Sequence, residues 1–300
     1  MDLWPDFPLP SPEAALRDSR SSSENARAAA AKGLGCVSKT DPVFKQAVSE
    51  LRVLLHDECA LVRGNAAISL GNLKAHEALE DIAALVSDPD HGVVQDAVSA
   101  LGLLADPDGA AAVHKAFEST DPDIRFQAVT AVTAVDHDNA PALLIKCLTD
   151  TDAEVRACAA AALGDIDARE AADHLARLLG DADRHVALEA AVSLARMGDD
   201  RGGERLVAAL NDRLYAPDAA LYLGSLKYAD ALDELRSIYS HWWHNRAARI
   251  NSAAAAAAMG DSDAVEFLQK RMGRKGLEGA LARSAAEQMN IRALAGEGSP

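Results

Sequence analysis

The sequence is poor in aromatic residues, which make up only 4% of its 300 residues, and in the side chains that favour β-strands. Although 49% of the residues are hydrophobic, much of that content is alanine, a strong helix former whose small side chain lets helices approach closely. Strands instead favour valine, isoleucine, threonine and aromatic residues. The composition therefore predicts an all-α protein.

Long apolar segments are also absent from the sequence. The longest apolar run, residues 253–259, is far shorter than the roughly 20 residues that span a bilayer. The first six residues, MDLWPD, lack the basic start and the apolar stretch of a secretory signal. We therefore expect a cytoplasmic protein that does not engage a membrane.

Positive charge is scarce, because 30 lysines and arginines stand against 46 aspartates and glutamates and give a formal net charge of -16. A protein that binds nucleic acid needs lysine and arginine on one face to displace counterions from the phosphates. The charge balance therefore argues against nucleic acid and against an anionic membrane surface. It suits a soluble protein, or one that meets a basic partner.

Chemical motifs are missing as well. None of the four cysteines, at positions 36, 59, 147 and 158, forms a C-x-x-C pair, and their place within helical patterns predicts buried or half-buried thiols. The sequence contains no nucleophile elbow, glycine-rich phosphate loop or dinucleotide fingerprint. His241 and His244 lie one helical turn apart, but no third metal ligand stands near them. We expect no catalysis, no cofactor and no metal.

What the sequence does contain is a repeat of 31 residues, visible as apolar columns when the chain is written in rows of that length. One column holds Ala66, Ala97, Ala128, Ala159 and Ala190. Two flanking columns hold Val62, Val93, Ile124, Val155 and Val186, and Leu70, Leu101, Val132, Leu163 and Leu194. Two further columns begin at Ile82 and Val86. The columns recur at helical spacing, which predicts two amphipathic helices per row.

Helix-capping aspartates and small glycines recur at fixed positions of the repeat. An aspartate column, Asp90, Asp121, Asp152 and Asp183, precedes the first helix of each row, where a carboxylate caps free backbone N–H groups. A glycine column, Gly71, Gly102 and Gly164, follows the leucines at a position where close helix contact needs a small residue. A single hairpin cannot bury its own apolar faces, but stacked hairpins can.

The segment DTDAEVRACAAAALG at 150–164 resembles the HEAT repeats of the short bacterial type, as in phycobilisome lyase subunits. The resemblance covers about residues 21–273 and implies a right-handed α-solenoid of about seven helical hairpins, whose first helices line the concave side. Residues 1–20 are expected to be a proline-rich irregular segment, 274–292 a capping helix and 293–300 a disordered tail. Thr133 and Ala195 depart from the pattern by replacing the glycine.

Two interpretations remain open for the arginine column of Arg63, Arg125 and Arg156. The arginines are either an anion-binding ladder or a structural ladder that pairs with aspartates of neighbouring turns, and we favour the second. The HEAT-repeat enzyme deoxyhypusine hydroxylase holds iron with several His–Glu pairs, whereas this chain has only the pair His76–Glu77.

Aromatic residues gather near the C-terminal end of the repeats. Half of them lie within residues 215–243, namely Tyr215, Tyr222, Tyr228, Tyr239, Trp242 and Trp243. Tyrosine and tryptophan are enriched at interaction hot spots. Large side chains also fill the space left by irregular stacking, so interface and core both remain open for this cluster.

A candidate partner-binding face follows from positions beside the alanine column, which vary in chemistry while the core columns stay constant. Its members are Asp96, Asp123, Gln127, Glu154, Glu189, Tyr222, Trp242 and Trp243, with the last three expected to be exposed. This acidic and aromatic face suits a basic segment with an apolar anchor. The sequence thus predicts a monomeric, non-catalytic scaffold that docks proteins on its concave side. The alternative is a bilin lyase subunit-like accessory factor for chromophore attachment.

Overall fold

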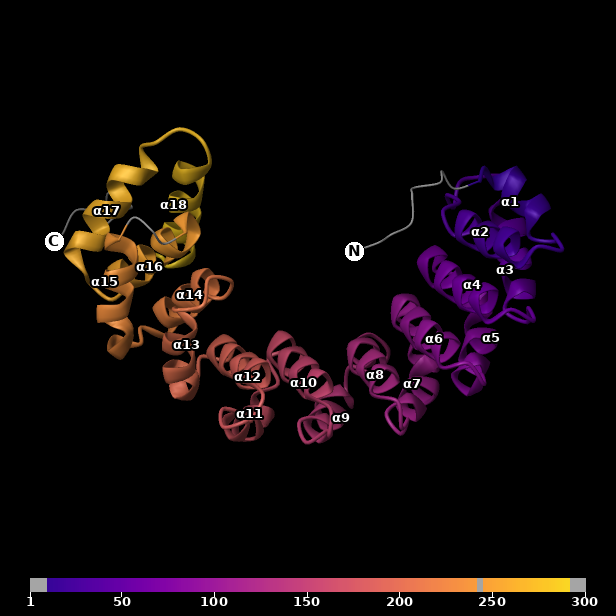
Figure 1. Ribbon diagram of the computed structural model, residues 1–300, viewed down its shortest axis with the longest axis horizontal. Coiled ribbons are helices and arrows are strands. Elements are labelled where there is room, and N and C mark those ends of the chain that lie inside the picture. Colours follow the sequence, from indigo (N-terminus) through magenta and orange to yellow (C-terminus); the bar gives the residue numbers. More distant parts are fainter. Residues whose placement is uncertain (1–9, 242–244, 292–300) are drawn as a thin grey trace. The chain divides into compact units, whose positions relative to one another are not determined.

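The computed structural model describes residues 10–241 and 245–291, and every regular element within them is helical (Figure 1). The first helices of the hairpins are α2 (Glu24–Leu34), α4 (Ala60–Leu73), α6 (His91–Leu104), α8 (Pro122–Val135), α10 (Ala153–Asp165), α12 (Arg184–Arg196), α14 (Ala216–Leu226) and α16 (Arg246–Ala258). The second helices are α3 (Phe44–Leu54), α5 (Leu79–Ala84), α7 (Ala110–Ala116), α9 (Ala140–Cys147), α11 (Ala172–Leu178), α13 (Gly203–Ala209), α15 (Leu232–Ser240) and α17 (Ser262–Met272). Helices α1 (Pro12–Asp18) and α18 (Leu277–Gln288) flank these pairs.

This arrangement confirms the all-α solenoid predicted from the repeat. The described residues hold eight hairpins, against about seven expected. The eighth is α16 with α17, which lies in the stretch where the 31-residue register is lost. No helix among the described residues combines the length and apolar character needed to cross a bilayer.

The chain divides into two compact units, Met1–Leu143 and Leu144–Pro300. In the first unit, α4 packs against α6 and α6 against α8, so the first helices of successive hairpins lie side by side (Figure 1). In the second unit, α10 packs against α12 and α14 against α16 in the same manner. The division falls within α9.

The predicted columns form the core. All five alanines from Ala66 to Ala190 are fully buried, and so are Leu70, Leu101, Val132, Leu163 and Leu194. In the column that begins at Val86, Phe117 and Leu179 are only half-buried, while the other members are buried. Apolar burial therefore drives the stacking of hairpins.

The aspartate column caps the first helices as predicted. Oδ1 of Asp90 accepts a hydrogen bond of 3.2 Å from the backbone N–H of Val93, and Oδ1 of Asp152 accepts one of 2.9 Å from that of Glu154. Asp121 and Asp183 cap α8 and α12 in the same way. These bonds satisfy N–H groups that have no partner within the helix.

The glycine column marks close contacts between successive first helices. A Cβ atom added at Gly71 would lie 3.0 Å from Cα of Ala100, and one added at Gly102 would lie 2.9 Å from Cβ of Ala131. Glycine on one helix and a small residue on the next therefore bring the two backbones together.

Two local expectations were wrong. The segment 1–20 is not irregular throughout, because Ser11 caps α1 through a 3.3 Å hydrogen bond from the N–H of Ala14, and Pro12 occupies the first helical turn, which tolerates proline. Cys36 is exposed rather than buried or half-buried, because it lies just beyond Gly35, where α2 ends. The tail expected to be disordered at 293–300 falls outside the described residues.

Candidate functional site

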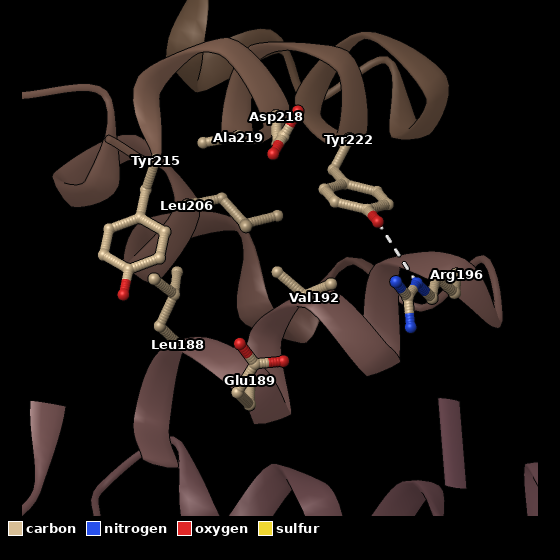
Figure 2. Close-up of a pocket in the computed structure, with 9 residues that line it drawn as sticks. All are labelled: Leu188, Glu189, Val192, Arg196, Leu206, Tyr215, Asp218, Ala219 and Tyr222. Carbon is tan, nitrogen blue, oxygen red and sulfur yellow. Dashed lines mark hydrogen bonds between the residues drawn. The ribbon is translucent and has the colours of Figure 1, made fainter. Parts of the chain in front are cut away.

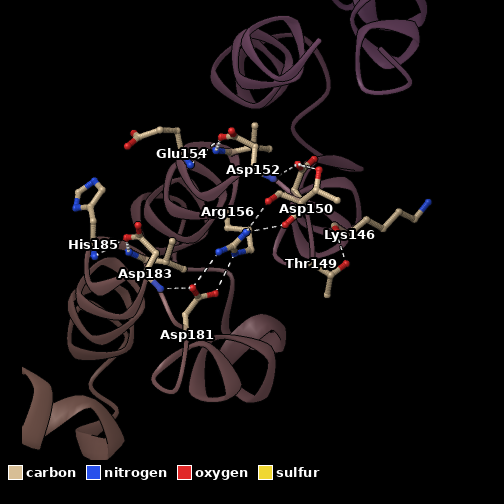
Figure 3. A network of polar contacts seen from close by, with 12 residues as sticks. Lys146, Thr149, Asp150, Asp152, Glu154, Arg156, Asp181, Asp183 and His185 are labelled. Atoms are coloured by element: carbon tan, nitrogen blue, oxygen red, sulfur yellow. Dashed lines mark hydrogen bonds and ion pairs between the residues drawn. The ribbon is translucent and has the colours of Figure 1, made fainter. Parts of the chain in front are cut away.

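The arginine column forms a structural ladder. In the second unit, Nε and Nη2 of Arg156 each donate a 2.9 Å hydrogen bond to the carboxylate of Asp181 (Figure 3). Nη1 of the same guanidinium donates to the carbonyl oxygen of Asp150 over 2.8 Å. Arg156 thereby ties the loop before its own helix, α10, to the loop before the next first helix, α12.

The same clamp recurs in the first unit. Nη2 and Nε of Arg63 contact the Asp88 carboxylate at 2.7 Å and 2.8 Å, and Arg27 pairs with Asp57 at 2.6 Å. Nη1 of Arg125 donates a 3.0 Å hydrogen bond to the carbonyl oxygen of Ser119, in the loop before its helix, as Nη1 of Arg156 does to that of Asp150. The structural interpretation of Arg63 and Arg156 is confirmed, because their guanidinium groups are occupied by the protein itself.

Three of the candidate residues lie in the first unit. Asp123, in the first turn of α8, is exposed. Oε1 of Gln127 accepts a 2.9 Å hydrogen bond from Oγ of Ser99, so this amide joins α8 to α6. Asp96 is half-buried beside Gly64, whose lack of a side chain makes room for the carboxylate. Burial raises the pKa of Asp96, an effect that the charge of Lys32 partly offsets.

In the second unit, a pocket of about 170 Å³ opens between α12 and α14 (Figure 2). It is lined by Leu188, Glu189, Val192, Arg196, Leu206, Tyr215, Asp218, Ala219 and Tyr222. This volume holds several water molecules, since one water needs roughly 10–15 Å³. Of the eight candidate residues, Glu189 and Tyr222 are the two that the pocket brings together, whereas Glu154 lies exposed at the start of α10.

The pocket coincides with a break in the pattern of small residues. At the preceding contact, a Cβ atom added at Gly164 of α10 would lie only 2.7 Å from Cβ of Ser193 on α12. At the next contact, Ala195 replaces the glycine and Tyr222 stands where Ser193 stands in its own repeat, one residue before the core leucine. We infer that these two larger side chains hold α14 away from α12, because the pocket opens between the same two helices.

Polar groups of the pocket are only partly engaged. Nε of Arg196 donates a 3.1 Å hydrogen bond to the hydroxyl oxygen of Tyr222, and Nη1 forms an ion pair with Asp165. Oε1 of Glu189 lies 3.9 Å from Nδ1 of His185, one turn earlier on α12. Burial raises the pKa of Glu189, although His185 and Arg196 oppose that rise. The pocket therefore contains a carboxylate that is partly desolvated and weakly paired.

A second pocket of about 350 Å³ adjoins the first along α14. Its lining consists of Asp218, Leu221, Tyr222, Ser225, Gln288 and Met289. Because Asp218 and Tyr222 line both pockets, the two cavities are neighbouring parts of one surface. We call this combined surface the α14 groove.

The aromatic cluster is divided between groove and core. Tyr222 is half-buried rather than exposed, because its ring lines both pockets and its hydroxyl contacts Arg196. Tyr239 lies in the core, where its hydroxyl donates a 3.1 Å hydrogen bond to Asp261 and its ring centroid lies 5.3 Å from that of Phe267. Trp242 and Trp243 lie outside the described residues.

Sequence reasoning missed two charged residues of the groove, Arg196 and Asp218. From the fifth row to the sixth the repeat is 29 residues long, since Leu194 is followed by Leu223. With that offset, Asp218 falls in the same column as Glu189, which was a candidate. Arg196 directly follows the glycine replacement at Ala195 and carries no other sequence signal.

Cys158 and His241 are not among the residues that line the groove. Burial, with the nearby charges of Glu154 and Glu189, raises the pKa of Cys158 to about 11, so its thiol stays protonated at neutral pH. Within residues 10–241 and 245–291, no three His, Cys, Asp or Glu side chains are grouped to hold a metal ion. His244, half of the pair considered as metal ligands, lies outside these ranges.

Comparison with known proteins agrees with the fold. Among solved structures, the Escherichia coli protein YibA matches with a TM-score of 0.54 and 16% identity, over 93% of this chain and 92% of that one. The CpcE–CpcF complex of phycocyanin lyase from Nostoc sp. PCC7120 matches at a TM-score of 0.41 and 21% identity, over 98% and 99%. Human deoxyhypusine hydroxylase matches at 0.38 and 17%, over 84% and 99%. At 16% identity the likeness to YibA concerns the fold alone.

A search of curated proteins finds no match. The family model for HEAT repeats, however, matches residues 13–102, 82–153 and 140–217, which together cover more than half of the chain. These matches include the rows on which the resemblance to HEAT repeats rested, and they confirm it. The chain therefore belongs to the HEAT-repeat family.

Proposed function

We propose that this chain is a non-catalytic scaffold that docks a partner protein on the first helices of its hairpins, with the α14 groove as the anchoring site. The observation that carries the proposal is the pocket between α12 and α14, at the contact where Ala195 and Tyr222 interrupt the pattern of small residues. Comparable contacts, such as Gly71 against Ala100, are tightly packed.

The composition of the groove fits this role. Tyrosine and arginine are enriched among the residues that dominate binding energy, and such anchors lie in concave sites that exclude water. Tyr215, Tyr222 and Arg196 line one pocket together with aliphatic side chains from α12 and α13. The net charge of -16 would speed the encounter with a basic partner. Glu154, which is exposed in the second unit, is proposed as an outlying contact, and Asp123, exposed in the first unit, as a separate contact of that unit.

The accessory-factor alternative differs in one measurable property, namely retention of a bilin. Bilins absorb visible light, so the absorbance of the purified chain after incubation with a bilin and gel filtration separates the two roles. A scaffold of the kind proposed retains no bilin. A stoichiometric visible band that survives gel filtration would favour the accessory role instead.

Affinity capture with quantitative mass spectrometry tests the docking proposal. The tagged wild type is compared with a groove variant, Glu189→Lys with Asp218→Lys. The matched control is Glu170→Lys with Glu234→Lys, which makes the same charge change at two exposed residues of the second unit, one preceding α11 and one in α15. Circular dichroism and thermal melting establish that both variants fold.

The proposal predicts a partner protein that the wild type and the control variant retain in stoichiometric amount and the groove variant loses. Equal retention by all three proteins would place the docking site elsewhere. If none of them retains a partner under native conditions, the scaffold proposal itself is wrong.

A further inference from the structure

The pocket between α12 and α14 has acidic groups on opposite walls. Glu189 comes from α12 and Asp218 from α14, and Figure 2 shows the two carboxylates across the cavity from each other. Asp218 is exposed, and none of the described residues donates a hydrogen bond to either carboxylate. The pocket therefore has acceptors available on both sides.

The cation already in the pocket is hydrogen-bonded to other groups. The Arg196 guanidinium is held by Asp165 and by the hydroxyl of Tyr222. Its carbon Cζ lies 6.0 Å from the centroid of the Tyr222 ring. Glu189, Asp218 and Asp165 thus outnumber the single arginine, which disfavours an anionic ligand and favours a cationic one.

The remaining walls are aromatic and aliphatic. Tyr215 lies at the start of α14 and Tyr222 within it, and Leu188, Val192, Leu206 and Ala219 complete the lining. Such walls accept the aliphatic stem of a long basic side chain, and a tyrosine face attracts its cationic end. The site suits a charged group that needs both carboxylates and an aromatic surface.

From this geometry we infer that the pocket is a subsite for one arginine side chain of the partner, placed between Glu189 and Asp218 and against the tyrosine rings. The inference rests on the docking function proposed above and names the chemistry of its anchor. A guanidinium is planar, presents five donors in fixed directions and stacks on aromatic rings, so it engages two opposed carboxylates at once. A lysine ammonium is more compact and more strongly hydrated.

The lining of the adjoining pocket bears on which kind of partner residue lies next to this arginine. Leu221 and Met289 line it, and Asp218 and Tyr222 connect it to the first pocket. A methionine wall adapts to different apolar shapes. The partner segment therefore carries an apolar residue next to its arginine.

Fluorescence anisotropy with short synthetic peptides tests this subsite without knowledge of the partner. The probe is a labelled peptide of six residues, Gly-Gly-X-Leu-Gly-Gly, in which X is arginine, lysine or citrulline. Citrulline has nearly the shape of arginine but no charge. We expect the arginine peptide to bind and the citrulline peptide to bind roughly ten- to a hundredfold more weakly, because a hydrogen bond to a charged group is worth about 1.5–3 kcal/mol. Lysine should fall between them.

Near-isosteric variants assign the binding to the pocket. Glu189→Gln and Asp218→Asn should each weaken the arginine peptide by about tenfold, as expected when one charged hydrogen-bond acceptor is lost. Tyr222→Leu removes the aromatic face and should also weaken it. The matched control is Glu234→Gln, which removes one exposed carboxylate on α15 and should leave binding unchanged.

Two results would overturn the inference: equal binding of the arginine and citrulline peptides, or arginine binding that survives both carboxylate variants. These failures are separable from those of the docking proposal. If the captured partner is lost by the groove variant but the arginine peptide does not bind, docking stands and the arginine subsite is wrong. If the arginine peptide behaves as expected but the captured partner binds the groove variant as well as wild type, the pocket binds arginine but does not hold this partner, and the docking proposal is wrong.

Discussion

Nε of Arg196 on α12 donates a 3.1 Å hydrogen bond to the hydroxyl oxygen of Tyr222 on α14, directly across the pocket between the two helices. Elsewhere in the second unit, the corresponding contact pairs Gly164 with Ser193, and the backbones nearly touch. At the contact between α12 and α14, a hydrogen bond between two long side chains therefore stands in place of close backbone packing.

Our explanation of the pocket, that Ala195 and Tyr222 keep the two helices apart, is tested by restoring smaller residues at both positions. Tyr222→Ala combined with Ala195→Gly restores the pattern that the tightly packed contacts share. We expect the free energy of unfolding of the double variant to exceed the value obtained by adding the two single effects by about 0.5–2 kcal/mol, because only the two changes together let the helices approach. Urea denaturation of the four proteins gives this coupling, and strictly additive effects would refute our explanation.

The arginine ladder should contribute measurably to stability in a manner that depends on pH. Arg156→Met removes two of the donors to the largely buried Asp181 carboxylate and leaves the backbone N–H of Asp183, so we expect a loss of about 1–3 kcal/mol in the free energy of unfolding at pH 7. Arg169→Met breaks an exposed pair with Asp167 and should change stability by less than about 1 kcal/mol.

The same comparison at acid pH shows how the stability contribution of the Arg156–Asp181 pair depends on the protonation of Asp181. Hydrogen bonds from Arg156 hold the pKa of Asp181 below its usual range, which is near 3.9. The contribution of this pair is therefore complete above about pH 4 and is lost as pH falls through the lower pKa of the folded state. The difference between wild type and Arg156→Met should shrink in that range, whereas a constant difference would mean that Asp181 does not titrate with the pair.

Glu189→Gln tests whether the ionised Glu189 carboxylate in the groove destabilises the folded protein. Burial raises the pKa of Glu189 in the folded state, so folding disfavours its ionised form. That penalty is absent below the unfolded pKa and grows as pH rises through the higher folded pKa. The variant should therefore unfold at a higher temperature than wild type at pH 7 and at the same temperature near pH 4. A lower melting temperature at pH 7 would show that Glu189 is satisfied in the folded protein.

The alanine column should tolerate no larger side chain. Ala128 is fully buried in α8, so Ala128→Leu forces extra methyl groups into a closed interface and should destabilise the chain by roughly 1–3 kcal/mol. The matched control is Ala111→Leu, which changes an exposed position on α7 of the neighbouring hairpin. Unfolding of Ala128→Leu at the same urea concentration as Ala111→Leu would contradict the assigned register.

The core was predictable because burial repeats every 31 residues, so Ala66 and its equivalents identify the helices, their faces and their caps. Prediction failed where a residue departs from its row. The helix at Pro12–Asp18 has no equivalent in the repeat, and its sequence signals are the cap at Ser11 and the proline in its first turn. Cys36 follows the helical pattern of its neighbours but lies past the end of α2.

The groove was predictable only in part, for a similar reason. Glu189 belongs to a variable column and Tyr222 to the aromatic cluster, so both were candidates. Asp218 was hidden by the 29-residue row, and Arg196 by the absence of any equivalent in other rows. A cavity arises from two side chains on different helices, and a column examined by itself does not show such a pair.

The most direct test of the docking proposal is hydrogen–deuterium exchange of the chain, alone and with the protein that affinity capture recovers. The proposal predicts slower exchange in α12 and α14, within residues 184–196 and 216–226, when the partner is bound. The Glu189→Lys and Asp218→Lys variant should show no such protection at the same partner concentration. Protection confined to other helices, with α12 and α14 unchanged, would contradict the claim that the α14 groove is where this scaffold holds its partner.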